Sequence, residues 1–370
     1  MNISLGIVGL PNVGKSTLFN ALTEKSVPAE NYPFCTIDPS VGIVPVKDGR
    51  LQVLSKLSGS QKIIPAVVEF VDIAGLVEGA STGAGLGNQF LSHIRETDAI
   101  VHVVRLFENN ATTDITHVYG TPHPKRDLEV IMMELILADL QTLEKRISNI
   151  EKDVRRGDEV AMAESACLKR LKSHLVESKP AFTFTTEGDI EPGFLYAMHF
   201  LTNKKMIVAG NRKSTGKNLN DTNKVLYDEF VAYAHEILHA SVILIDAQSE
   251  GELKSFSEEE RDEMRTDLQV EGVGLDGLID AGYKALGLMS YLTTGEMETR
   301  AWTVKIGSSA PVAAAAIHTD FEKKFIRAEV VAFADFIECG SLTEARNKGK
   351  LRVEGKTYIV QDGDVIEFRV

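Results

Sequence analysis

The sequence contains little cysteine and no long hydrophobic run. Its 370 residues include three cysteines, Cys35, Cys167 and Cys339, which lie far apart. Cysteines in this number and spacing form neither a disulfide framework nor the ligand pairs of a zinc site. No apolar stretch approaches the ~18–20 residues of a membrane-spanning helix, so we expect no membrane contact. Residues 1–9 show no basic leader and no small-residue cleavage site, and we therefore expect a cytoplasmic protein.

The sequence also lacks an excess of positive charge. It has 40 Lys and Arg against 53 Asp and Glu, a formal net charge of -13, which argues against a protein that coats nucleic acid with its whole surface. Residues 301–370 differ, because their ten basic and ten acidic side chains balance. Any contact with RNA should therefore use a local patch. The seven candidates, which can equally form a solvated face balanced by acids, are Lys323, Lys324, Arg327, Arg346, Lys348, Lys350 and Arg352.

Short apolar runs alternate with helical segments over much of the chain. A chain of this length, with 44% hydrophobic residues, is expected to form two or three globular domains. The first helix is expected from Lys15 to Lys25. Strands that alternate with helices favour a doubly wound α/β sheet. The expected strands are residues 2–10, 66–71, 99–104, 206–209 and 241–245.

A different pattern lies between the third and fourth of these strands. Apolar residues step by three and four positions from Met133 to Val154, and again from Leu168 to Leu175. This spacing is typical of the seam of a coiled coil. Two antiparallel helices that turn near Gly157 are the simplest interpretation. We favour a projecting hairpin over two ordinary core-facing helices, because the charged stretch 144–158 leaves only a narrow apolar stripe.

The last ~70 residues change character and predict a separate, β-rich domain. One helix is expected from Val312 to about Lys324, and a turn at residues 361–364 is expected between the final two strands. The strands expected in this domain are residues 303–306, 328–333, 356–360 and 365–370.

Residues 9–16 read GLPNVGKS and match the phosphate-loop pattern G-x-x-x-x-G-K-[ST]. The match follows an expected strand and opens an expected helix, which is the context that the motif requires. Its glycines let backbone N–H groups converge on a phosphate, and the helix N-terminus adds partial positive charge. We expect Lys15 to reach the β- and γ-phosphates and the Ser16 hydroxyl to bind Mg²⁺.

Two further segments fit the switches of a GTPase-type nucleotide site. Asp72-Ile73-Ala74-Gly75 follows a buried strand, so Asp72 is expected to hold Mg²⁺ through water and the Gly75 N–H to sense the γ-phosphate. Thr36 lies in a loop that could close over the metal. Residue 76 is Leu, where Ras-type GTPases place a glutamine that orients the attacking water. We therefore expect slow intrinsic hydrolysis, or another group that orients the water.

The base-recognition segment departs from the guanine pattern N-K-x-D. Asn211 is present, but the fourth residue is Ser214, which supplies no carboxylate. Without that acceptor, the two N–H donors of guanine are poorly paired, and discrimination for GTP should fall. Adenine becomes plausible, unless Asp221 or Asp246 supplies the acceptor.

Together these motifs resemble the YchF-type Obg-like ATPase family of translation-factor-related P-loop NTPases, over nearly the whole chain. The family usually has an acidic residue where this chain has Ser214. The motifs that carry the resemblance are Gly9–Thr17, Asn31–Ile37, Asp72–Ala80, Gly85–Leu91, Ile94–Ile100, Ala301–Thr303, Ile317–Val330 and Val360–Asp364.

The resemblance implies an α/β fold: a P-loop NTPase doubly wound sheet with an inserted coiled-coil helical hairpin and a C-terminal β-grasp (TGS) domain. Residues 1–125 and 204–284 would form the NTPase domain, residues 126–203 the hairpin and residues 285–370 the TGS domain. The resemblance also implies Mg²⁺ with ATP as cofactor and binding to the ribosome or its large subunit. We expect the chain to be a monomer.

The resemblance further implies the site residues. Leu76 fits the family's hydrophobic replacement of the catalytic glutamine, and His117 matches a loop histidine proposed in its place, with His123 and His102 as alternatives. The metal ligands would be Ser16, Thr36 and Asp72. The nucleotide-binding residues would be Asn12, Val13, Gly14, Lys15, Ser16, Thr17, Gly75, Asn211 and Arg212.

The favoured hypothesis is a Mg²⁺-dependent switch that hydrolyses ATP slowly, and GTP weakly, and binds ribosomes. One alternative is a ribosome- or RNA-binding module in which the nucleotide is mainly structural. Another is an Obg-like GTPase, against which Ser214 argues.

Overall fold

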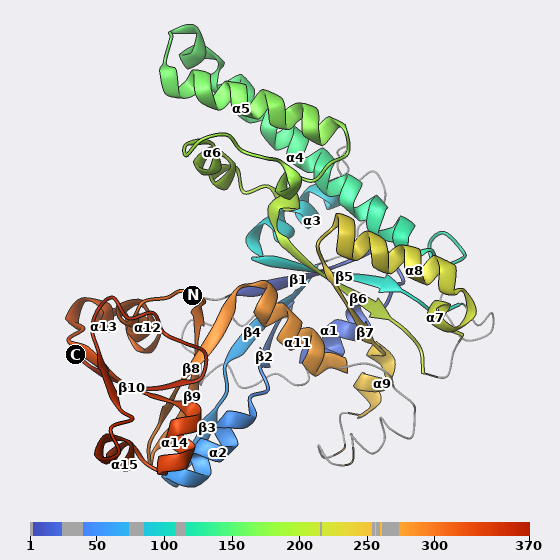
Figure 1. Cartoon of the computed structure of the whole chain (residues 1–370). Helices are drawn as coiled ribbons and strands as arrows, with labels where there is room; N and C mark the ends of the chain where they lie inside the picture. Colours follow the sequence, from blue (N-terminus) through green and yellow to red (C-terminus); the bar gives the residue numbers. More distant parts are fainter. Residues whose placement is uncertain are drawn as a thin grey trace.

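The computed structural model describes residues 3–23, 40–73, 85–108, 116–214, 217–253, 256, 260 and 274–370. Two six-stranded sheets organise this part of the chain, and a long helical hairpin projects from the first of them (Figure 1). None of the described helices is long and apolar enough to cross a membrane.

The first sheet has the order β2-β4-β1-β5-β6-β7, in which β2 is antiparallel and the other strands are parallel. All seven residues of the central strand β5 are buried, as expected for a parallel sheet covered on both faces. The five predicted strands are confirmed, and the antiparallel edge strand β2 was not predicted. The strands are β1 Ser4–Val8, β2 Val41–Pro45, β4 Val67–Asp72, β5 Ala99–Arg105, β6 Lys205–Asn211 and β7 Ser241–Ile245.

Helices cover this sheet and connect its strands (Figure 1). The predicted first helix is confirmed as α1, Lys15–Thr23. The last helix of the layer, α11, approaches β1 so closely that a Cβ at Gly282 would lie 2.5 Å from Leu5 Cδ1. Besides α1, the helices of the layer are α3 Gly85–Glu96, α7 Leu219–Thr222, α8 Lys224–Ala232, α9 Ala247–Glu252 and α11 Gly274–Ala285.

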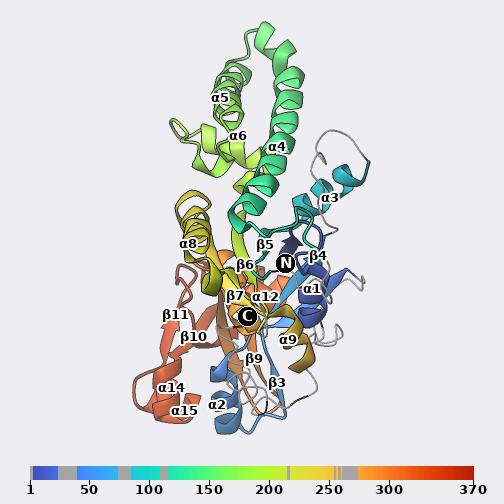
Figure 2. The ribbon, with the colours of Figure 1, turned by 90° about the vertical axis from the view of Figure 1, so that its right-hand side faces the viewer.

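The predicted hairpin is confirmed as two helices, α4 Pro124–Arg155 and α5 Glu159–Val176, that turn at Gly157 with φ +82°. Its far end stands clear of the sheet in two perpendicular views (Figures 1 and 2). The predicted seam residues are buried or partly buried, which confirms the predicted spacing, except that Met133 is 40% exposed. Met133 lies near the end of α5, where Ser178 Oγ is 3.9 Å from its sulfur, and its neighbours Met132 and Leu135 are buried.

One buried carboxylate fixes the place where the hairpin rejoins the sheet. Asp139 of α4 accepts hydrogen bonds from the backbone N–H groups of Leu201 and Thr202, both at 2.8 Å, and from Thr202 Oγ1 at 2.7 Å. These residues directly precede β6. The short helix α6, Glu191–Met198, lies between α5 and this junction.

The second sheet has the order β11-β10-β12-β8-β9-β3. Its last strand β12 runs parallel to β8 and antiparallel to β10, which is the arrangement expected of a β-grasp domain. Helices α12 and α13 pack beside the sheet, and α14 and α15 follow β10. The elements are β8 Leu288–Thr294, β9 Glu298–Lys305, α12 Ala310–Ile317, α13 Thr319–Lys324, β10 Arg327–Ala332, α14 Phe333–Cys339, α15 Leu342–Asn347, β11 Arg352–Glu354 and β12 Asp364–Arg369.

The sequence prediction for this domain is corrected in several places: β8, β11, α14 and α15 were not expected, one expected strand is absent, and one expected helix is divided. Residues 356–360 are not a strand, because their backbone groups bond instead to the start of α12, through Ala310 N to Tyr358 O at 2.8 Å and Val360 N to Ser308 O at 3.0 Å. The single helix expected from Val312 is two helices, because His318 is extended and its Nδ1 accepts from Asp320 N to begin α13.

The second sheet also takes in a segment from far earlier in the sequence. After β2, the chain forms α2, Gly49–Ser58, and then β3, Lys62–Ile64, which pairs in parallel with β9. Ser60 Oγ donates to Gly295 O at 2.7 Å. The C-terminal sheet is therefore built partly from the polypeptide between two strands of the first sheet.

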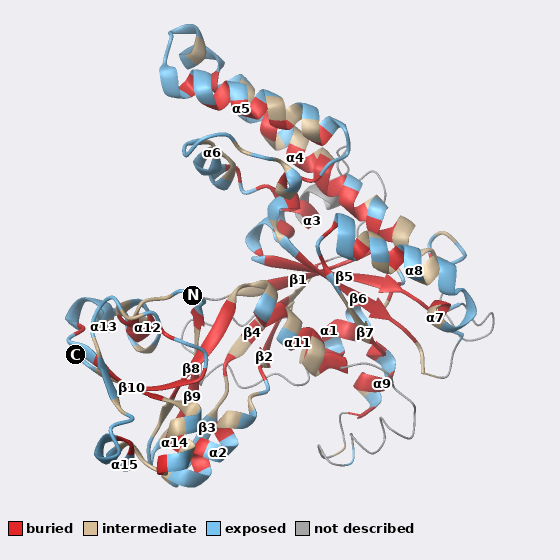
Figure 3. Ribbon diagram, in the orientation of Figure 1, coloured by how far each residue is buried: buried red, intermediate tan, exposed pale blue. Residues whose placement is uncertain are grey.

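One buried apolar cluster is continuous between the two sheets, and Figure 3 shows buried residues along strands of both sheets. Leu288, Leu292 and Val365 of the C-terminal sheet belong to the same buried apolar cluster as Leu5 and Leu54. The opposite face of the C-terminal sheet has a smaller core of its own around Tyr291. The two halves thus share apolar contacts as well as polar ones.

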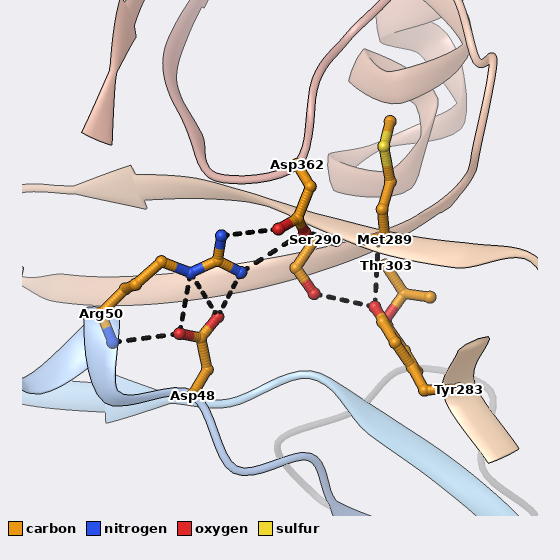
Figure 4. Close-up of polar contacts among 7 residues, drawn as sticks. All are labelled: Asp48, Arg50, Tyr283, Met289, Ser290, Thr303 and Asp362. Carbon is orange, nitrogen blue, oxygen red and sulfur yellow. Dashed lines mark hydrogen bonds and ion pairs between the residues drawn. The ribbon is translucent and has the colours of Figure 1, made fainter. Parts of the chain in front are cut away.

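Polar contacts across the junction centre on Arg50 (Figure 4). Its guanidinium pairs with Asp48 at 2.8 Å and with Asp362 of the C-terminal domain at 2.7 Å. Asp362 Oδ1 also accepts from the backbone N–H of Ser290 at 3.1 Å. Nearby, the Tyr283 hydroxyl of α11 lies 2.8 Å from Ser290 Oγ and donates to Met289 O at 3.1 Å.

We expect Arg50→Ala to lower the free energy of unfolding by about 1–2 kcal/mol, because it removes a partly buried cation held by two carboxylates. Denaturant unfolding measures the change. Lys56→Ala is the matched control, because Lys56 is an exposed residue of the same helix. Equal unfolding curves for the two variants would contradict the structural role given to Arg50.

Candidate functional site

The phosphate loop lies between the end of β1 and the start of α1. Gly9 has φ +155°, Asn12 +64° and Gly14 +101°, so the loop turns through conformations that glycine adopts most easily. A Cβ at Gly14 would lie 2.2 Å from Asn211 Nδ2, and one at Gly9 would lie 2.5 Å from Val103 O. Both glycines are therefore required by close packing as well as by backbone conformation.

Lys15 is folded into the loop. Its side chain is buried at 8% exposure, and Nζ donates to Leu10 O at 2.8 Å. Burial lowers the pKa of Lys15 from 10.5 to about 8, an effect that the nearby Asp72 carboxylate partly opposes. Burial in turn raises the pKa of Asp72, while Lys15 lowers it. An anion bound in the loop would favour the charged form of Lys15.

We expect ATP binding near pH 8.5 to take up most of one proton. The pKa of Lys15 in the free protein is about 8, and a bound triphosphate should raise it, so the lysine charges on binding in the window between about 8 and 10. Calorimetry in buffers of different ionisation enthalpy measures this uptake. At pH 7 the lysine is already charged and the uptake should nearly vanish. A binding enthalpy independent of buffer at pH 8.5 would contradict the expectation.

The hydroxyls of Ser16 and Thr17 are exposed in the cleft above the loop. Asp72 ends β4, pairs with Ile7 of β1, and interacts electrostatically with Lys15. Hydroxyl and carboxylate oxygens are the donors that Mg²⁺ prefers, so Ser16 and Asp72 suit the metal chemically. Thr36, Gly75 and Leu76 lie outside the described residues.

Asn211 joins the phosphate loop to the base end of the cleft. Its Nδ2 donates to Val13 O at 2.9 Å, and its Oδ1 accepts from Ala247 N, the first residue of α9, at 3.2 Å. The side chain is 5% exposed. Asn211 thus orders backbone groups on both sides of the cleft.

The cleft has a volume of about 450 Å³ and lies at the carboxyl ends of β1, β5, β6 and β7. The sequence analysis missed Arg105 and Phe107 at the end of β5 and Lys213 after β6. Arg105 Cζ lies 3.9 Å above the centre of the Phe107 ring, and Lys213 Nζ lies 5.9 Å from it. Their position was a usable signal, because ligands of open α/β sheets bind where parallel strands end. The residues that line the cleft are Asn12, Gly14, Lys15, Ser16, Thr17, Arg105, Phe107, Asn211, Arg212, Lys213, Asp246 and Gln248.

The structure separates the two carboxylates that were open as base acceptors. Asp246 lines the cleft, whereas Asp221, in the short helix α7, is not among its lining residues. Ser214 Oγ donates to Asp246 Oδ2 at 2.7 Å. The residue at the position of the missing carboxylate is therefore bonded to an acid from the next strand.

His117 lies beside the phosphate loop but is buried, at 2% exposure. The preceding residue, Thr116, accepts from Asn12 Nδ2 at 3.1 Å. His117 Nδ1 accepts from Tyr119 N at 3.2 Å, and Nε2 lies 3.0 Å from Asp127 Oδ2 of α4. Both ring nitrogens therefore face protein groups in this arrangement, and the catalytic role of His117 stays a prediction.

The two alternative histidines have different surroundings. His102 is buried in β5, and burial together with Lys15 lowers its pKa to about 3, so it is neutral near pH 7. His123 begins α4, where its Nδ1 accepts from Arg126 N at 3.3 Å. Of the three histidines, only His117 directly follows a residue bonded to the phosphate loop.

Two family models match the chain. Residues 4–140 match a model described as 50S ribosome-binding GTPase. Residues 288–370 match a model for the C-terminal region of YchF GTPases, described as a protein of unknown function (DUF933).

Full-length relatives are similar over the whole chain. The chain is 47% identical to the ribosome-binding ATPase YchF of Bacillus subtilis and 46% identical to that of Escherichia coli O157:H7, covering 100% of this chain and 99% of each relative. The solved YchF GTPase of Schizosaccharomyces pombe superposes with a TM-score of 0.84 at 35% identity, covering 100% of this chain and 98% of that one. These matches in sequence and fold show that the chain belongs to the YchF family.

Proposed function

We propose that this protein is a Mg²⁺-dependent ATPase that binds the ribosome. The observation that carries the proposal is the phosphate loop at the carboxyl end of β1, in a cleft that Lys15, Arg105, Arg212 and Lys213 line with positive charge. Relatives of nearly the same length are named ribosome-binding ATPases. The solved relative from Schizosaccharomyces pombe is named a GTPase, so the choice of base needs its own test.

Different site residues have different proposed roles in nucleotide binding and hydrolysis. The backbone of residues 12–17 would surround the phosphates, and Lys15 would leave Leu10 O to contact them. Ser16, Asp72 and Thr36 would hold Mg²⁺, which when bound shields phosphate charge and favours hydrolysis. The Gly75 N–H would contact the γ-phosphate, and Asn211 and Arg212 would border the nucleotide. Slow turnover follows from Leu76, which cannot orient water.

We also propose the domain boundaries, the ribosomal subunit that is bound, the oligomeric state and the cellular location. Residues 1–125 and 204–284 form the NTPase domain, 126–203 the hairpin and 285–370 the TGS domain, with the segment around α2 and β3 lying on the TGS sheet. We further propose that the large ribosomal subunit is the binding partner and that the protein is a cytoplasmic monomer. The matched description of residues 4–140 names a 50S ribosome-binding GTPase, which supports the choice of subunit.

The alternative of a C-terminal RNA-binding module has less support. Of the seven basic candidates, five contact carboxylates in the structure: Lys324, Arg327, Arg346, Lys350 and Arg352. The single carboxylate of Glu329 contacts three arginines, Arg327, Arg346 and Arg369. Balanced charges of this kind favour the solvated face over an RNA-binding patch.

Phosphate release from ATP and GTP, measured with and without 70S ribosomes and separated subunits, tests the function. We expect slow release from ATP, faster release with ribosomes or the large subunit, and weak release from GTP. Tight ribosome binding without stimulated hydrolysis would favour the module instead.

Replacement of His117 tests its catalytic role. We expect His117→Ala to slow ATP turnover about 10²–10⁴-fold, the usual contribution of a positioned proton-transfer group, with the Kd for ATP nearly unchanged. Asp127→Asn is the comparison, because it alters the partner of His117 and keeps the imidazole. Single-turnover hydrolysis and ATP binding are measured for both variants. If His117→Ala turns over at full speed, the residue is not catalytic.

A further inference from the structure

Asp246 is the only carboxylate among the described residues that line the cleft. It follows β7 and caps the N-terminus of α9. Only 2% of the residue is exposed. An acid at this end of the cleft would ordinarily be the acceptor for the N1–H and N2–H donors of guanine, so its availability decides which base fits.

Protein donors already occupy this carboxylate. Oδ2 accepts from Ser214 N at 2.6 Å, Ser214 Oγ at 2.7 Å and Ser249 Oγ at 2.8 Å, while Oδ1 accepts from Ser249 N at 2.9 Å. The two serine hydroxyls also lie 2.8 Å from each other. Each carboxylate oxygen offers about two acceptor sites, so Oδ2 is fully occupied while Oδ1 keeps one position. The carboxylate therefore cannot offer both oxygens to the adjacent N1 and N2 donors of guanine.

Among the described residues beside Asp246, the amide side chains of Asn211 and Gln248 do not replace its carboxylate. Asn211 Oδ1 accepts from Ala247 N and Nδ2 donates to Val13 O. The Gln248 amide nitrogen donates to Glu252 Oε1 at 3.0 Å, and the residue is exposed, so its oxygen is a neutral acceptor at the rim. One neutral acceptor matches the single N6 donor group of adenine better than the adjacent N1 and N2 donors of guanine.

We propose that Ser214 and Ser249 set the base preference of this site by occupying Asp246. The inference rests on the proposed ATPase function and names the groups that would disfavour GTP there. It also gives Ser214 a purpose: the position that carries an acceptor in guanine-specific sites here carries a donor. That donor hydrogen-bonds Asp246, the one acid among the described residues that line the cleft. Ser214 and Ser249 are positioning residues, because they act through Asp246.

The double variant Ser214→Ala and Ser249→Ala removes both hydroxyl donors and leaves Asp246 in place. We expect the ratio of GTP affinity to ATP affinity to rise about tenfold, because a freed carboxylate can pair with both donors of guanine and such charged hydrogen bonds are strong. Calorimetric titration of each Mg²⁺-nucleotide into the full-length chain measures the ratio. Adding Asp246→Asn to the double variant is the control, and it should return the ratio close to the wild-type value.

The outcomes distinguish failure of the proposed ATPase function from failure of the inference on Asp246. Wild-type protein that binds neither nucleotide would overturn the proposed function. If wild type binds ATP but the double variant keeps the wild-type ratio, the inference on Asp246 is overturned while the function stands. A gain of GTP binding that persists with Asp246→Asn also overturns it, because extra space rather than the carboxylate would then explain the gain. Wild-type protein that binds GTP more tightly than ATP would likewise overturn the inference on Asp246.

Folding of each variant is checked by circular dichroism and thermal unfolding. If the double variant does not fold, Ser214→Ala alone is used, because Ser214 is only partly buried and its backbone N–H bond to Asp246 remains. We expect this single variant to shift the ratio toward GTP by about threefold, since one of the two hydroxyl donors is removed. An unchanged ratio would overturn the inference.

Discussion

Lys15→Ala is expected to reduce ATP affinity by at least about 100-fold. The variant removes the cation that the phosphate loop places at the β- and γ-phosphates, and two or more charge-assisted hydrogen bonds would be lost with it. The same change removes a buried ammonium whose pKa burial has lowered to about 8. We therefore expect the free protein to keep its fold, so that the loss of binding reflects the site.

Calorimetric titration with ATP and Mg²⁺ measures this loss. Lys213→Ala is a useful comparison, because Lys213 also lines the cleft but follows β6 and is not part of the phosphate loop. We expect that variant to weaken binding much less. Unchanged ATP affinity in Lys15→Ala would contradict the assignment of the phosphate site.

Asn211→Ala is the second change with a large expected effect. It leaves two buried backbone groups, Val13 O and Ala247 N, without the side-chain partner that the structure gives them. Each such loss costs about 1–3 kcal/mol, so the two together should lower the free energy of unfolding by about 2–6 kcal/mol. ATP affinity should fall as well, because one of the two groups belongs to the phosphate loop.

Denaturant unfolding and ATP titration measure both effects. Asn203→Ala, at an exposed position just before β6, is the matched control and should change neither quantity appreciably. Asn211→Asp keeps the acceptor for Ala247 N but loses the donor to Val13 O, so it should weaken ATP binding even where the protein remains stable. Wild-type stability in Asn211→Ala would contradict the bridging role.

Local sequence patterns predicted the nucleotide-binding half of the fold well. The phosphate loop is recognisable because its chemistry needs fixed residue types at fixed spacing, and the strands around it are continuous apolar runs. The strand predicted at 241–245 has the same bounds in the structure. The helical hairpin was predictable for the same reason, since a seam repeats every three or four residues.

Non-local contacts were beyond such patterns. β3 is only three residues long, and its pairing with β9 joins residues more than 230 positions apart. The Arg50 contact with Asp362 also joins distant parts of the chain and has no sequence signal of its own. The strand predicted at 356–360 was wrong for a related reason: its backbone groups found partners at the start of α12 instead of in a sheet.

The candidate site was predicted in part. The residues of the phosphate loop and Asn211 do gather around one cleft. The burial of His117 against Asp127 could not be foreseen, because it depends on where the first turn of α4 packs. The occupied state of Asp246 was equally hidden, since it results from three residues brought together by the ends of β6 and β7.

Direct binding of ATP and GTP to the purified full-length chain, each with Mg²⁺, tests the central claim most directly. The account predicts saturable binding of one ATP per chain and weaker binding of GTP. Absence of binding for both nucleotides, with the metal present and the protein folded, would contradict the claim that the loop between β1 and α1 is a triphosphate site.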